Sequence, residues 1–179
     1  MRKLIAVAVL ALIAPACAAS GVLGPGGGGE SSPSPDQTRL DVYETTIRYL
    51  AGAENIDWEN VYVRIPICEN AGEPAEPKGC TDSFSFGEQT GLTERLADLG
   101  APLVFVQGYE DLGNRILEGK ERSVFVWVGP IVPDGENVQV GGGMSCGGLC
   151  GSGSTYELVP RGASWKVDGP APGAGSWIS

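Results

Sequence analysis

The sequence predicts an α+β domain in which two N-terminal helices pack on a mainly antiparallel, curved β-sheet, as in cystatin-like or NTF2-like folds. Apolar residues at helical spacing are confined to the first part of the folded region. Short β-rich runs, separated by Gly, Pro, Asp and Asn, make up the rest. The regular βαβ alternation that is typical of a parallel sheet is missing.

The first helix is predicted from Leu40, Tyr43, Ile47 and Leu50, which recur at helical spacing before Gly52 ends the pattern. Residues 61–67 then alternate apolar and other side chains, which predicts a strand with one buried face.

Pro66 cannot donate a ladder hydrogen bond, so this strand is expected to lie at an edge or to end there. After a polar loop, leucines over 92–99 predict a short second helix that Gly100 terminates.

The remaining runs are predicted strands. In 123–128, Val124 and its alternate neighbours face one way while Phe125 and Trp127 face the other, so we expect a central strand with both faces covered. The other predicted strands are 103–107, 138–141, 155–159 and 165–167.

The N-terminal residues predict export. Residues 1–17 have a basic start and an apolar run over 4–14, which is too short for a membrane span and is typical of a signal peptide. A lipoprotein peptidase would cut before Cys17 and leave it for acylation, whereas Ala16-Cys17-Ala18 also suits ordinary signal peptidase. Residues 18–37, rich in Gly, Ser and Pro, predict a flexible linker, and 38–179 a single domain.

Cysteine usage agrees with export. If Cys17 carries lipid, Cys68, Cys80, Cys146 and Cys150 remain for two disulfides, and three connectivities are open. A zinc site built from all four is the rival interpretation, although the spacings do not match a zinc ribbon or finger.

Net charge restricts the partners. Without Arg2 and Lys3 the chain keeps 10 basic and 22 acidic residues, which gives a net charge near −12. We therefore expect no binding to nucleic acid.

The glycine-rich stretch 141–154 imitates catalytic motifs without completing one. Ser145 stands where a nucleophile elbow has its serine, but the chain contains no histidine to serve as its base. No Lys-Ser or Lys-Thr pair closes a phosphate loop. Cys146 and Cys150 are expected between strands, where a structural disulfide is the plain interpretation and a thiol-redox pair the alternative.

Acidic residues leave an enzyme conceivable. Glu69, Glu73, Glu76, Asp82 and Glu88 lie close in sequence, and two of them in a concave sheet would supply acid–base chemistry without histidine. Solvated surface residues are the simpler interpretation.

The C-terminal third supports a resemblance. Cys146-Gly147-Gly148-Leu149-Cys150-Gly151 is followed by Thr155-Tyr156-Glu157-Leu158 and Trp165-Lys166-Val167. This segment resembles uncharacterised bacterial exported proteins and lipoproteins with a CGGxCG loop before a Gly-x-Trp-x-Val hairpin. The chain departs from that pattern because Ala163 and Ser164 take the place of the usual glycine before Trp165. The resemblance implies export, a disulfide and a hairpin, and it implies no activity.

The sequence thus predicts a non-catalytic exported envelope module, anchored to the membrane through lipid or else secreted. It would bind an unknown protein or small molecule, without cofactor or metal. The alternatives are a carboxylate enzyme and a thiol-redox or metal protein that uses Cys146 and Cys150.

Overall fold

The computed structural model describes residues 34–52, 56–69, 77–112, 116, 121–147 and 150–178. The predicted signal segment, Cys17 and most of the predicted linker lie outside the described residues. No helix among the residues described here is both long and apolar enough to cross a membrane.

Helix α1 (Pro35–Gly52) begins three residues before the predicted start of the domain. Ser34 precedes it and its Oγ accepts a hydrogen bond from the Gln37 amide at 3.2 Å. Pro35 suits the first helical position, where no amide hydrogen is needed. The side of α1 that carries Val42 and Ile47 is buried, as the apolar spacing predicted.

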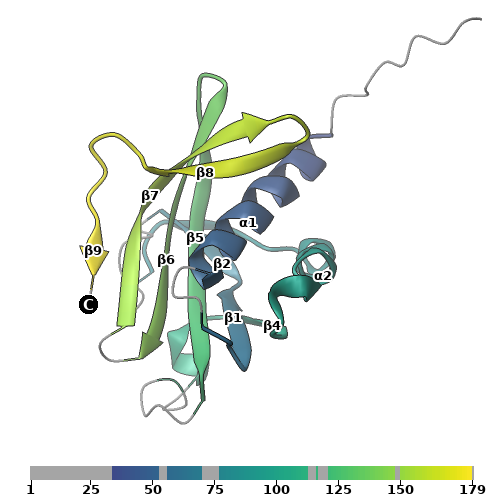
Figure 1. Ribbon diagram of the computed structural model, residues 1–179, viewed down its shortest axis with the longest axis vertical. Helices are drawn as coiled ribbons and strands as arrows, with labels where there is room; N and C mark the ends of the chain where they lie inside the picture. Colours follow the sequence, from purple (N-terminus) through teal and green to yellow (C-terminus); the bar gives the residue numbers. More distant parts are fainter. Residues whose placement is uncertain are drawn as a thin grey trace, which may run out of the picture. The chain divides into compact units, whose positions relative to one another are not determined.

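Seven strands form one mixed sheet within the described parts of the chain, in the spatial order β4-β1-β5-β6-β7-β8, with β9 paired to β7 (Figure 1). These strands are β1 (Asn60–Arg64), β4 (Leu103–Val106), β5 (Ser123–Asp134), β6 (Asn137–Gly147), β7 (Cys150–Arg161), β8 (Ser164–Pro170) and β9 (Trp177–Ile178). Strands β2 (Pro66–Cys68) and β3 (Cys80–Ser83) form a separate antiparallel pair. The predicted α+β class and mainly antiparallel sheet are confirmed.

The prediction that both helices precede the sheet is wrong, because β1, β2 and β3 lie between α1 and α2 (Phe86–Arg95). Strand β1 runs parallel to both β4 and β5. Parallel neighbours cannot be joined by a tight turn, so the chain must cross over between them. Helix α2 lies in the crossover from β1 to β4.

Strand β1 also buries more than the single face expected of it. Val61 and Val63 join the core under α1, while Tyr62 and Arg64 on the opposite face are buried as well. The strand is central and not an edge strand. It ends before Pro66, which is the second of the two outcomes expected for that proline.

Strand β5 confirms the expected two-sided pattern. Val124, Val126 and Val128 belong to the core that α1 covers, whereas Phe125 and Trp127 belong to a second apolar cluster on the other face. All five side chains have no exposed surface. The sheet therefore has two buried faces along its central strand.

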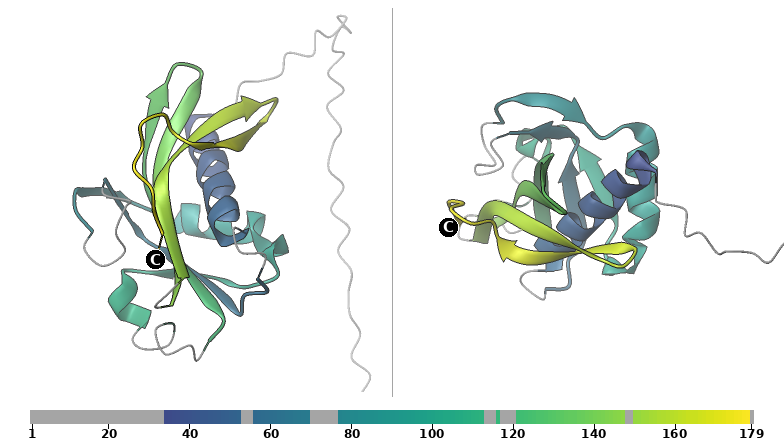
Figure 2. Two further views of the ribbon diagram at one scale, coloured as in Figure 1. Left: turned by 60° about the vertical axis from the view of Figure 1, so that its left-hand side comes forward. Right: turned by 90° about the horizontal axis from the view of Figure 1, so that it is seen from above.

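The sheet curves around α1. In Figures 1 and 2 the long β5–β6–β7 segment lies along one side of the helix, and the β7–β8 hairpin bends across its N-terminal half. Close packing is possible because Gly142 of β6 lies beneath the helix. A Cβ at Gly142 would lie 3.1 Å from Leu50 Cδ1 and 3.2 Å from the Trp127 carbonyl oxygen.

The glycine-rich stretch forms strands, not the loop that we expected between 141 and 155. Trp127 lies over Gly143, and Trp177 lies over Gly153 of the paired strand. The two indole rings stack with centroids 6.0 Å apart and an interplanar angle of 7°. Glycines carry no side chains whose alternation would predict a strand. Here the two indole rings cover the glycines in place of such side chains.

Two disulfides are present, as predicted. Cys68 and Cys80 join β2 to β3 with an S–S distance of 2.05 Å. Cys146 pairs with Cys150 across the β6–β7 connection. The cysteines thus form separate pairs, and no group of three or more metal-ligating side chains occurs among the described residues.

The close approach at Gly143 generates a prediction. A Cβ there would lie 2.5 Å from Trp127 Cζ2 and 2.8 Å from the Ser152 carbonyl oxygen. We expect Gly143→Ala to lower the free energy of unfolding by about 1–3 kcal/mol, because the ring and strand must move apart. Urea denaturation measures the change.

Gly87→Ala is the matched control, since Gly87 lies in α2 with no atom within 4 Å of a Cβ. It should leave stability unchanged or raise it by up to about 1 kcal/mol through helix propensity. Equal stabilities for the Gly143→Ala variant and the unmodified protein would contradict the packing described here.

Candidate functional site: a groove between a helix and an edge strand

The concave face of the sheet is filled by α1. Val42, Tyr43 and Ile47 of the helix are fully buried and share one apolar cluster with Val126 and Val140 of the strands. The enzyme hypothesis needs a pair of carboxylates in a concave sheet, but this surface is covered by packed hydrocarbon. Accessible sites must therefore be sought at the edges and ends of the sheet.

Two of the predicted carboxylates do come together. Arg39 Nη1 lies 2.8 Å from Asp82 Oδ2, and Arg39 Nε lies 2.6 Å from Glu88 Oε1. Both carboxylates border a cleft of about 600 Å³ beside the N-terminus of α2. The other members of the predicted cluster are either exposed, as Glu69 is, or outside the described residues, as Glu73 and Glu76 are.

Glu88 is held in its ionised form. Burial acts to raise its pKa, but hydrogen bonds from Ser85 and Arg39 outweigh that effect and the pKa lies below the usual range. The Ser85 amide and hydroxyl donate to Glu88 Oε2 at 2.8 and 2.7 Å, and the Glu88 amide donates to Ser85 Oγ. This is a capping box, so Glu88 serves to begin α2 and is poorly suited to donate a proton in catalysis.

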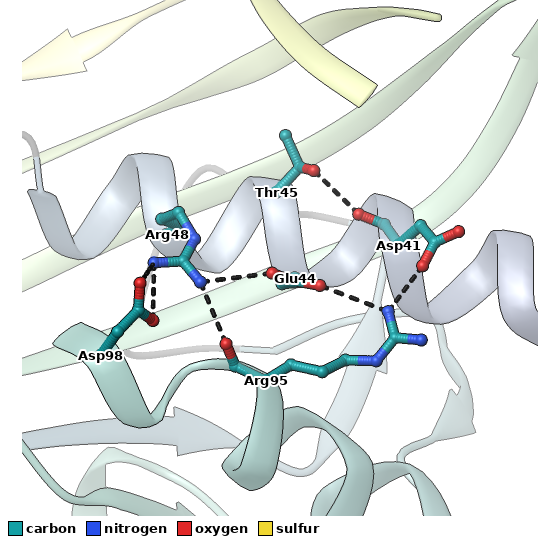
Figure 3. Close-up of polar contacts among 6 residues, drawn as sticks. All are labelled: Asp41, Glu44, Thr45, Arg48, Arg95 and Asp98. Atoms are coloured by element: carbon teal, nitrogen blue, oxygen red, sulfur yellow. Dashed lines mark hydrogen bonds and ion pairs between the residues drawn. The ribbon is translucent and has the colours of Figure 1, made fainter. Parts of the chain in front are cut away.

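A network of ion pairs fixes α2 against α1 (Figure 3). Arg95 Nη1 lies 2.5 Å from Asp41 Oδ1 and 3.2 Å from Glu44 Oε2. Arg48 contacts Glu44 at 3.2 Å and Asp98 at 2.9 Å, and it also donates to the Arg95 carbonyl oxygen at 3.0 Å. Shared partners make this a network, which holds a helix better than isolated surface pairs do.

Helix α2 stands beside β4, the edge strand of the sheet. The Val61 and Ile65 amides of the β1 segment donate to the Pro102 and Val106 carbonyl oxygens. Main-chain groups alternate sides along a strand, so those of Leu103 point away from β1. The same holds for Phe105. No other strand within the described residues pairs with this side of β4.

A groove made of two hollows follows this edge. Two adjoining hollows of about 350 and 540 Å³ share Thr93 and Leu103. Phe86, at the first position of α2, lines the larger hollow and is 84% exposed. The remaining lining residues are Leu96, Ala97, Gly100, Ala101 and Pro102 at one end, and Gln89, Thr90, Glu94, Val104 and Phe105 at the other.

The groove has the properties of a binding surface. It combines outward main-chain donors and acceptors with an exposed aromatic ring and apolar strand residues. An unpaired edge of this kind is a template for a further strand, and natural sheets usually protect it with charge, proline, a bulge or a covering helix or loop. Here α2 stands beside the edge and leaves the two hollows open between them. Residues 103–106 carry no charge.

Sequence reasoning did not find this groove. Phe86 lies six residues before Leu92 and falls outside the buried stripe of α2. The Ser85-Phe86-Gly87-Glu88 capping box was a usable signal, because it fixes where α2 begins and places Phe86 at its start. The free edge of β4 had no such signal, because strand order depends on contacts distant in sequence.

The predicted cysteine sites lie elsewhere. None of Cys68, Cys80, Cys146 and Cys150 lines the groove. Cys68 is fully buried, and Cys146 and Cys150 are partly buried against the main core. Each cysteine of the second pair lies at the end of a strand and not at the start of a helix, where a thiol pKa would be lowered, which suits a structural disulfide better than a redox pair.

Comparisons with known families, curated proteins and solved structures gave no match. The resemblance to exported proteins with a CGGxCG loop therefore stays a prediction, and the candidate site depends on geometry alone.

Proposed function

We propose that this protein is a non-catalytic exported module that binds an extended polypeptide segment along β4, in the groove beside α2. The observation that carries the proposal is that the exposed ring of Phe86 and the free edge of β4 line the same hollow. Main-chain pairing along the edge would give affinity, and the hollows on either side of Thr93 would select alternate side chains of the partner.

The chemistry of the groove describes its partner. Leu103 and Phe105 favour apolar side chains, while Glu94, exposed at the rim, favours a basic one. The net charge, near −12 once Arg2 and Lys3 are removed with the signal segment, acts in the same direction by attracting basic segments over longer distances. We therefore infer a strand-forming segment that alternates apolar residues and includes Lys or Arg.

An extracytoplasmic setting fits this function. The two disulfides indicate an oxidising compartment outside the cytoplasm. Within that setting we propose a lipoprotein held through Cys17 and a short linker. The cystatin-like or NTF2-like comparison belongs to the proposal only as a description of a curved sheet around a helix, and it carries no activity.

Cross-linking from the groove tests the binding proposal. With p-benzoylphenylalanine in place of Phe86, the full-length protein in its native envelope should form a discrete cross-linked product on illumination. The same group in place of Tyr49, an aromatic residue exposed at 42% on α1, should not form it. Thr93→Arg fills the shared part of the groove and should lower the yield on the order of tenfold.

Gln37→Arg is the matched control, because it adds the same side chain at an exposed helical position outside the groove. Its yield should equal that of the unsubstituted protein. Identical products from positions 86 and 49, or a yield unaffected by Thr93→Arg, would exclude the groove as the binding surface.

Intact-mass spectrometry tests the anchor separately. Protein recovered from the native envelope should begin at Cys17 and carry acyl chains, and a Cys17→Ser variant should lose them and leave the membrane fraction. A mature mass beginning after Cys17, without lipid, would show ordinary secretion and leave the groove proposal intact.

A further inference from the structure

The two crossovers at β1 and β4 lie on opposite faces of the sheet. The connection from β1 to β4 contains α2, whose Leu92 belongs to the core under α1, as does Leu96 directly after the helix. The connection from β4 to β5 contains the short helix η2 (Tyr109–Leu112), and Leu112 belongs to the second cluster with Phe125. Where successive connections leave on opposite faces, a crevice forms at the carboxyl ends of parallel strands, and open sheets bind ligands there.

Arg64 lies at that position. It is the last residue of β1 and is paired in register with Val106, the last residue of β4. Its side chain shares the η2 face with Tyr62, since both alternate with the core valines of β1. The carboxyl end of the parallel strands therefore carries a cation on the face that η2 covers.

The guanidinium of Arg64 is buried and incompletely bonded. The residue has no exposed surface. Its Nε donates to the Pro66 carbonyl oxygen at 3.2 Å, whereas Nη1 and Nη2 have no hydrogen-bond partner among the described residues. Buried polar groups in native proteins are almost always paired, so two free nitrogens on one buried cation call for an additional ligand.

The nearby acidic residues do not supply that ligand. Burial lowers the pKa of Arg64 to about 10 and the charge of Glu110 acts against that shift, so the group stays protonated at neutral pH. Glu110 is exposed and its carboxylate folds over Gly108. Asp111 Oδ2 accepts from the Gln107 amide at 2.8 Å and so closes the turn before η2.

We propose that Arg64 binds a small oxyanion, a carboxylate or an inorganic phosphate, at the carboxyl ends of β1 and β4. The planar fork formed by Nη1 and Nη2 matches two oxygens of such an anion. Glu110 lies near enough to repel the anion and so limits its affinity. The site is independent of the peptide groove, because it lies on the η2 face and shares no residue with the groove.

Thermal unfolding of the full chain in phosphate or acetate, with sodium chloride holding ionic strength constant, tests the site. We expect the Tm to rise saturably with one of the two probes and not with chloride alone, because the anion binds only the folded state. A response to phosphate alone identifies an inorganic phosphate, and a response to acetate alone a carboxylate. Either supports the site, and a flat response to both overturns it.

Substitutions connect the response to Arg64. Arg64→Met should abolish it, and Glu110→Gln should shift half-saturation to a lower anion concentration by removing the repulsion. Arg122→Met is the control, because Arg122 has a side chain 68% exposed and should keep the full response. An equal response in the Arg64→Met variant and the unmodified protein would overturn the proposal.

If Arg64→Met does not fold, Arg64→Lys tests whether Arg64 binds the anion. Lysine keeps the charge but lacks the two-pronged donor, so half-saturation should require about tenfold more anion. Unchanged half-saturation in that variant would show that the fork of Arg64 does not bind the anion.

Discussion

The packing of α1 into the concave face of the sheet is the constraint on which the rest of the structure depends. Gly142 permits it, because any side chain there would meet Leu50 and the main chain of Trp127. The helix takes the space where a curved sheet would otherwise hold a ligand. What remains accessible is the β4 edge beside α2, while the carboxyl ends of β1 and β4 lie under η2.

Much of the fold follows from local patterns in the sequence. The apolar spacing in α1 and the two-sided alternation in β5 were readable because neighbouring residues alone determine them. The parallel pairing of β1 with β4 was not, since it joins segments about forty residues apart through a crossover. The strands at Gly143 and Gly153 also escaped prediction, because the rings that cover them come from Trp127 and Trp177.

The candidate sites were harder to predict than the fold. Alternation in β1 assigned Arg64 to an uncovered face, and only the placement of η2 shows that this face is buried. Phe86 differs, because the capping box that places it at the start of α2 was visible in the sequence. Its exposure points to binding only because the ring lies beside an open strand edge. Both sites therefore depend on which connection passes over which face, and the sequence does not encode that locally.

Residue-resolved hydrogen exchange of the free protein tests the central claim, that β4 presents an open edge, most directly. The amides of Leu103 and Phe105 should exchange rapidly, whereas those of Val104 and Val106, which face β1, should be protected. That alternation is the result expected of an uncovered strand. Equal protection of all four amides would show that another segment or a second molecule already covers the edge, and it would contradict the proposed binding surface.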